Sequence, residues 1–264
     1  MGFRISKGRF GSAIKCLLCA AAVLSFCICS HAEEREAGPE RLFARGNDYY
    51  EQGDYQNAIN EYKKIIDGGQ ASGPLYYNIA GAYFKSGQLG KAVLNYRRAM
   101  FLMPRDGDLK ANYKFAKSAV LEKPPSPQGI WQKAGIGLYA GNFTVNELAI
   151  LSSAAYILAL FLLYLLLTRH AVNWYLSVVI LCLVLYIGLN MAVIWKKAHD
   201  YRTGAVTVSS EAQAYYGPFD TATKFFTLNE GVHVNVLSSK DDWYKVRRRD
   251  GKIGWVKKTT MERI

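Results

Sequence analysis

Two apolar stretches near the middle of the chain decide its fold: Leu148–Leu167 reads LAILSSAAYILALFLLYLLL, and Val172–Trp195 reads VNWYLSVVILCLVLYIGLNMAVIW. Neither contains Asp, Glu, Lys or Arg, and each is long enough to cross about 30 Å of hydrocarbon as a helix rising about 1.5 Å per residue. The sequence therefore predicts two transmembrane helices, 148–167 and 172–195. The alternative, a buried hairpin in a soluble protein, is disfavoured because soluble helices normally carry a polar stripe.

The connection between these helices, residues 168–171, is too short to return the chain across a bilayer. The helices should therefore form an antiparallel hairpin, and the segments before and after it should lie on the same side of the membrane. No charged side chain lies within either span, although a transport path usually needs one. The hairpin is therefore expected to serve as an anchor, with Asn190 available to pair with helices of another protein.

The N-terminus has the pattern of a secretory signal peptide over residues 1–32. Basic residues precede an apolar run, and Ser30-His31-Ala32 offers a cleavage site of small residues. An uncleaved anchor is the alternative, but the run of about 14 residues is shorter than the roughly 20 that a span needs. Four of the five cysteines leave with this leader, so the mature chain would keep only Cys182 and form no internal disulfide.

Orientation follows from the leader. A cleaved leader predicts that the N-terminal domain lies outside the cytoplasm, and the hairpin then returns the C-terminal domain to the same outer side. The positive-inside rule opposes this weakly, because Arg169 lies in the inner loop while Lys196, Lys197 and Arg202 flank the second helix on the outer side. The leader takes priority because long domains translocate largely regardless of their charge.

The net charge of +12 is unevenly distributed. Residues 33–122 carry 13 basic and 12 acidic side chains, whereas residues 196–264 carry 13 basic and 8 acidic ones. The excess lies in the leader and the C-terminal domain, which argues against nucleic acid as the main partner.

Residues 33–121 contain a repeat with a spacing of 34 residues. Small, aromatic and glycine positions recur in pairs: Gly46 with Ala80, Tyr49 with Tyr83, Gly53 with Gly87, Ala58 with Ala92, and Tyr62 with Tyr96. This pattern resembles the tetratricopeptide repeat (TPR), a helical hairpin in which small residues permit close packing and aromatic residues fill the gap. We expect repeats over about 42–70 and 74–104 and a capping helix over 108–121. Because about three repeats are usually needed for stability, we also expect self-association or support from a partner.

The resemblance implies that an extended peptide or a helix binds in the concave groove formed by the first helix of each repeat. Carried onto this chain, the groove positions are Asn47, Tyr50, Tyr77, Asn78, Phe84 and Asn112. An Asn there can hold a peptide backbone with both its amide donor and its carbonyl acceptor. The alternative for any one of these residues is local capping or core packing.

Residues 122–147 form a linker. Its Pro-rich start, KPPSPQG at 123–129, cannot continue a helix, and the aromatic residues that follow suit a membrane interface.

The C-terminal residues 204–264 change to a period of two. Alternating stretches at Val232–Val236 and Trp243–Val246, with turns such as Asp250-Gly251, predict a small all-β barrel. Two sequence motifs resemble those of the bacterial SH3-like domain: Asp242-Trp-Tyr-Lys-Val246 and Asp250-Gly-Lys-Ile-Gly-Trp-Val256. That resemblance implies binding of peptides or cell-wall glycopeptide.

The three adjacent arginines and the histidine of this domain each have a structural and a functional interpretation. Arg247, Arg248 and Arg249 precede a hairpin turn, where they form either a solvated tip or a contact with an anionic surface. His233 lies on an alternating strand without a second His or Cys nearby, so it is expected to be a surface or packing residue rather than a ligand. No catalytic, cofactor-binding or metal-binding residues are predicted, and the chain is expected not to be an enzyme.

The order of these modules, a leader, two TPR units, a membrane hairpin and a terminal SH3-like barrel, resembles the BatE family, the TPR component of bacterial aerotolerance (Bat) operons. The resemblance implies an adaptor or scaffold in the bacterial inner membrane. Its N- and C-terminal domains would face the periplasm, and it would work with membrane-anchored Bat proteins that carry von Willebrand A domains. The alternative is a wall-binding protein whose barrel grips peptidoglycan while the TPR unit recruits a wall enzyme. The fold class expected is therefore multi-domain: all-α TPR hairpins, a two-helix transmembrane hairpin and a small all-β SH3-like barrel.

Overall fold

The computed structural model describes residues 38–121, 136–168 and 174–264. The predicted leader, the first residues of the expected TPR domain (33–37), most of the linker (122–135) and the short connection with Asn173 (169–173) lie outside the described residues.

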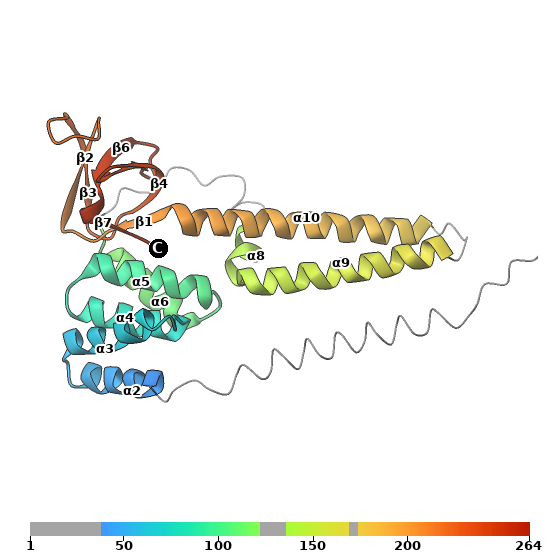
Figure 1. Ribbon diagram of the computed structural model, residues 1–264, viewed down its shortest axis with the longest axis horizontal. Helices are drawn as coiled ribbons and strands as arrows, with labels where there is room; N and C mark the ends of the chain where they lie inside the picture. Colours follow the sequence, from blue (N-terminus) through green and yellow to red (C-terminus); the bar gives the residue numbers. More distant parts are fainter. Residues whose placement is uncertain (1–37, 122–135, 169–173) are drawn as a thin grey trace, which may run out of the picture. The chain divides into compact units, whose positions relative to one another are not determined.

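Five helices make up the N-terminal part: α2 (Gly38–Glu51), α3 (Tyr55–Asp67), α4 (Gly73–Lys85), α5 (Leu89–Leu102) and α6 (Gly107–Ser118). Polar side chains begin three of them, since Asp54, Ser72 and Asp106 accept hydrogen bonds from backbone N–H groups of the first turn. Gly53 and Gly87, which are equivalent in the repeat, both have φ of 79° and reverse the chain after α2 and α4. The resulting hairpins are stacked, with α3 against α4 and α5 against α6 (Figure 1).

Small residues bring these helices together as the repeat pattern predicts. A Cβ atom placed on Gly46 would lie 2.4 Å from Cε1 of Tyr62, so the glycine makes room for that ring. Ala58, Ala80 and Ala92 are fully buried between helices. The two aromatic positions, Tyr62 and Tyr96, lie in the core, so they join neighbouring hairpins as the repeat requires.

The apolar region consists of a short helix α8 (Ile136–Asn142) and two long helices, α9 (Val145–Thr168) and α10 (Trp174–Thr203). Helices α9 and α10 pack against each other and run antiparallel (Figure 1). Both are long and apolar enough to cross a membrane, with mean hydropathies of 2.3 and 2.5 over their most apolar windows, of which only 22% and 11% is buried. A soluble core hairpin would bury most of that surface.

Two details of the apolar region differ from the sequence-based expectation. The second helix continues from Trp195 to Thr203, because hydropathy marks the end of an apolar span and not the end of a helix. Asn190 is fully buried within the chain: its Oδ1 accepts a hydrogen bond from Tyr139 Oη at 2.8 Å, and its Nδ2 donates to the Tyr186 carbonyl at 2.9 Å. The expectation that Asn190 pairs with another protein's helix is therefore wrong.

The C-terminal part begins where α10 ends. It is a seven-stranded sheet in the order β3-β2-β6-β5-β4-β1-β7 with antiparallel pairing. Its elements are β1 (Gly204–Thr207), β2 (Glu211–Tyr215), β3 (Lys224–Asn229), β4 (His233–Lys240), β5 (Trp243–Arg247), β6 (Ile253–Lys257), a 3₁₀ turn η1 (Lys258–Thr260) and β7 (Met261–Arg263). Alternate residues, including Val234, Val246 and Val256, fill its core. The predicted fold class is confirmed: TPR-like helical hairpins, two apolar helices and a C-terminal SH3-like sheet.

Candidate functional site

The TPR helices enclose a cavity of about 320 Å³, which we call the groove. It is lined by Asn47, Tyr50, Glu51, Tyr62, Tyr77, Asn78, Gly81, Tyr96 and Asn112. Five of the six groove residues predicted from the sequence thus lie together in one hollow. The sixth, Phe84, lies outside the lining and packs on Phe115 of α6, with ring centroids 5.5 Å apart.

A hydrogen-bond network orders one wall of the groove. Oδ1 of Asn47 accepts hydrogen bonds from Tyr62 Oη at 2.7 Å and from Asn78 Nδ2 at 3.1 Å, which connects α2 to both α3 and α4. On the other wall, Asn112 Nδ2 donates to Tyr77 Oη at 2.6 Å. The asparagines therefore serve packing as well as the groove. Within the described residues, these bonds leave Asn47 Nδ2 and Asn78 Oδ1 available to a ligand's backbone.

Three tyrosines of the groove, Tyr50, Tyr62 and Tyr96, remain neutral well above physiological pH. Burial is the largest cause that raises the pKa of Tyr62 and of Tyr96 to about 12, and it also raises the pKa of Tyr50. Neutral phenols can both donate and accept hydrogen bonds, and their rings offer flat apolar faces. The groove is thus suited to holding a polypeptide segment.

Four lining residues were not predicted as site residues: Glu51, Tyr62, Gly81 and Tyr96. The repeat pattern already marked Tyr62 and Tyr96, but as packing residues, and their hydroxyl ends reach the hollow while their rings fill the core. Gly81 precedes a buried alanine on α4 and lies beside Tyr50, whose Oη would be 3.4 Å from a Cβ placed there. Glu51 carries no pattern signal, because it lies at the end of α2.

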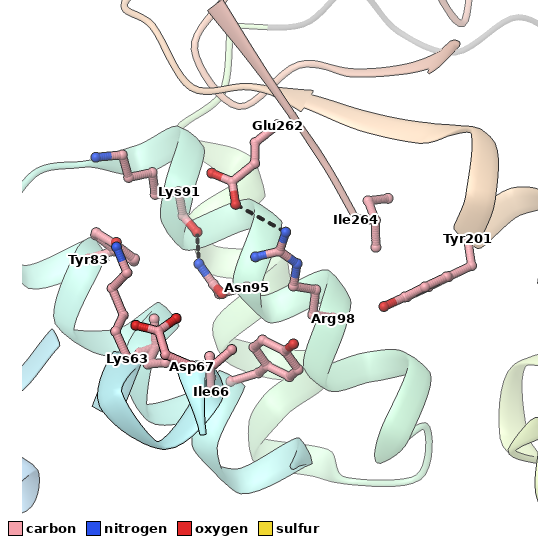
Figure 2. A pocket seen from close by; sticks show the side chains of 12 residues that line it. Lys63, Ile66, Asp67, Tyr83, Lys91, Asn95, Arg98, Tyr201, Glu262 and Ile264 are labelled. Carbon is pink, nitrogen blue, oxygen red and sulfur yellow. Dashed lines mark hydrogen bonds and ion pairs between the residues drawn. The ribbon is translucent and has the colours of Figure 1, made fainter. Parts of the chain in front are cut away.

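A second cavity, of about 400 Å³, is formed where α5 meets the end of the chain (Figure 2). Figure 2 shows Arg98 directed at Glu262, and Nη2 of Arg98 lies 3.0 Å from Glu262 Oε1 and donates to the Arg263 carbonyl at 2.6 Å. Glu230 adds another link to the TPR helices, because its Oε1 accepts a hydrogen bond from Gly90 N at 2.7 Å. This cavity is lined by residues distant in sequence, so no local sequence pattern predicted it.

The three adjacent arginines have different environments. Arg248 pairs with Asp250 and lies over the Phe226 ring, 4.8 Å from its centroid, so it stabilises its own hairpin. Arg247 and Arg249 are both exposed, and Arg249 also lines another cavity, beside α5 and α6. A contact of these arginines with an anionic surface stays a prediction.

His233 is packed within the protein. Its Nε2 is buried without a hydrogen-bond partner among the described residues, and burial above all, followed by the charges of Arg97 and Arg249, lowers its pKa to about 2. The imidazole is thus neutral. Among the described residues, no group of His, Cys, Asp or Glu side chains could hold a metal ion.

Comparison with known families agrees with this architecture. Residues 39–67 and residues 73–100 each match a model of the tetratricopeptide repeat, and residues 208–262 match a model of the bacterial SH3 domain. None of the curated proteins matches the chain. The matched families define a class, a chain with TPR repeats and a C-terminal bacterial SH3 domain. Both are typically non-catalytic modules for protein–protein interaction or cell-wall binding, and no enzyme family is among the matches.

Proposed function

We propose that this protein is a non-enzymatic adaptor of the bacterial inner membrane, in which the TPR groove and the SH3-like domain each bind a protein partner. The observation that carries the proposal is the groove itself, where Asn47, Tyr50, Tyr77, Asn78 and Asn112 come together from three helices. The polar groups and flat rings gathered there suit an extended peptide segment.

The apolar helices support the membrane assignment. Large side chains such as Ile157 and Leu185 are about two-thirds exposed on α9 and α10. Apolar surface of this extent is rare on soluble monomers and marks contact with lipid or with another protein. As a hairpin anchor, the two helices would keep both folded domains on one side of the membrane, and the leader expected over residues 1–32 makes that side the periplasm.

The order of the modules resembles that of the BatE family. Under this proposal the partners are membrane-anchored Bat proteins with von Willebrand A domains, and the protein works in aerotolerance complexes. Anchoring both modules beside the membrane raises their effective concentration toward partners that are anchored there too, so that modest affinities suffice.

Photo-crosslinking in living cells tests the groove directly. A photoreactive residue replacing Tyr50 should capture a membrane protein, whereas the same residue at Gln56, which is exposed on α3 away from the groove, should capture far less. Phe84 is an informative third position, because it lies beside the groove but not in its lining. Recovery of wall material alone, or equal capture from Tyr50 and Gln56, would contradict the adaptor.

A second candidate function, binding to peptidoglycan, is favoured by the aromatic surface of the SH3-like domain. Tyr216 and Phe219 are 63% and 54% exposed, and Tyr216 lies against Phe225 with ring centroids 4.4 Å apart. Exposed aromatic rings can stack on sugar rings. Sedimentation of the purified full chain with wall sacculi separates the two functions: saturable binding lost in Tyr216→Ala favours the wall protein, and no binding favours the adaptor.

A further inference from the structure

The groove has an unusual charge for a peptide site. Among the residues that the structure describes, no Lys or Arg contributes to its lining, and Glu51 is the one charged residue there. The remaining lining consists of tyrosines, asparagines and Gly81, all neutral. An acidic peptide would therefore meet a carboxylate and find no cation to pair with.

Glu51 occupies a position that helix stability disfavours. It is the last residue of α2, where the partial negative charge of the helix end opposes a carboxylate. The last turn of α2 contains no basic residue to offset this. Within the described residues, Glu51 also forms no ion pair. A residue that violates a local rule without compensation in the fold is a candidate for function.

The groups around Glu51 are those that bind a cation well. The Tyr50 and Tyr77 side chains in this lining are partly exposed, and aromatic faces attract ammonium and guanidinium groups. Asn78 Oδ1 and the phenol oxygens add neutral acceptors. Gly81 lies beside Tyr50 in this lining and adds no side chain to the hollow.

We propose that the groove recognises an Arg or Lys side chain of the partner's extended segment, with Glu51 as the counter-charge and the tyrosines as the surrounding wall. This inference rests on the proposed function of the groove as a peptide site. It names the chemistry of the partner: a basic side chain and not an acidic or purely apolar one.

Binding of tripeptide amides to the purified full chain in detergent, followed by saturation-transfer NMR, tests the inference. The probes are acetyl-Ala-Arg-Ala-amide and its citrulline counterpart, which keeps the shape of arginine without the charge. We expect the arginine peptide to bind roughly fivefold more tightly, the range of partly exposed ionic and cation–π contacts. Glu51→Gln should remove most of this preference. Asp48→Asn, which neutralises an exposed carboxylate on the same helix outside the lining, should leave the preference unchanged.

Several outcomes would overturn the cation site. These are equal affinity for the two peptides, no saturable binding of the arginine peptide, a preference that survives Glu51→Gln, or an equal loss in Asp48→Asn. Crosslinking from position 50 distinguishes failure of the cation site from failure of the groove as a peptide site. If a partner is still captured there, the groove binds a segment of other chemistry. If none is captured, the proposed function itself fails.

Discussion

The contact between Gly46 and Tyr62 shows how closely single residues determine the TPR hairpin. Glycine at 46 leaves space for the Tyr62 ring, whose hydroxyl then reaches Asn47 and orders the groove wall. The same ring therefore fills the core and shapes the site. Changes at this contact should affect stability and the groove together.

Gly46→Ala is expected to lower the free energy of unfolding by about 1–3 kcal/mol, because the added methyl group overlaps the Tyr62 ring. Denaturant unfolding of the full chain in detergent, followed by circular dichroism, measures the change. Gly107→Ala is the matched control, since a Cβ there meets no atom within 4 Å. Equal effects of the two variants would contradict the tight packing.

Alkaline pH should weaken the TPR fold through its buried phenols. The pKa of Tyr96 is raised to about 12, mainly by burial, whereas a tyrosine in the unfolded chain has a pKa of about 10. Between about pH 10 and pH 12 the unfolded state loses this proton while the folded state keeps it, so the free energy of unfolding falls as pH rises. Thermal unfolding across this window should show a shallower decline in Tyr96→Phe. An unchanged slope in that variant would contradict the assigned burial.

At the scale of elements, capping determines where the helices begin. Asp106 accepts a hydrogen bond from Leu109 N at 2.8 Å and starts α6, which closes the groove and carries Asn112. Loss of this cap should fray the first turn of α6, since such a cap contributes about 1 kcal/mol. Fraying of α6 would also weaken the groove wall, because Asn112 on this helix donates a hydrogen bond to Tyr77.

Asp106→Ala should therefore speed hydrogen exchange at the Leu109 amide, because that N–H loses its acceptor. Hydrogen–deuterium exchange of the full chain, resolved to the peptide containing residues 107–112, measures the effect. Asp108→Ala removes a nearby acid without removing the cap and should change this exchange much less. Equal acceleration in both variants would show that charge and not capping stabilises the turn.

Most elements follow from local sequence patterns, and the exceptions have physical reasons. The 34-residue period predicted the TPR hairpins because each repeat uses the same packing contacts, and that geometry also brings Asn47, Asn78 and Asn112 to one hollow. Glu51 was not predicted as a groove residue, because hydrophobic periodicity does not distinguish the residues at a helix end. The pairing of Arg98 with Glu262 joins residues 164 positions apart, so no local pattern encodes it.

In the whole molecule, the hairpin of α9 and α10 determines whether the TPR groove and the SH3-like domain lie on the same side of a membrane. Two helices of high hydropathy, largely unburied and antiparallel, place the chain segments before and after them on one side of any membrane they cross. If the TPR groove and the SH3-like domain share a compartment, they can hold two partners together. If they do not, no adaptor of the proposed kind exists.

Membrane topology is therefore the most direct test. Alkaline phosphatase, which is active only outside the cytoplasm, is fused in one strain after Glu40 and in another after Ile264. A cytoplasm-active reporter at the same positions serves as the control. The proposed hairpin topology predicts phosphatase activity, and no cytoplasmic reporter activity, at both positions. Phosphatase activity at Glu40 together with cytoplasmic reporter activity at Ile264 would contradict it.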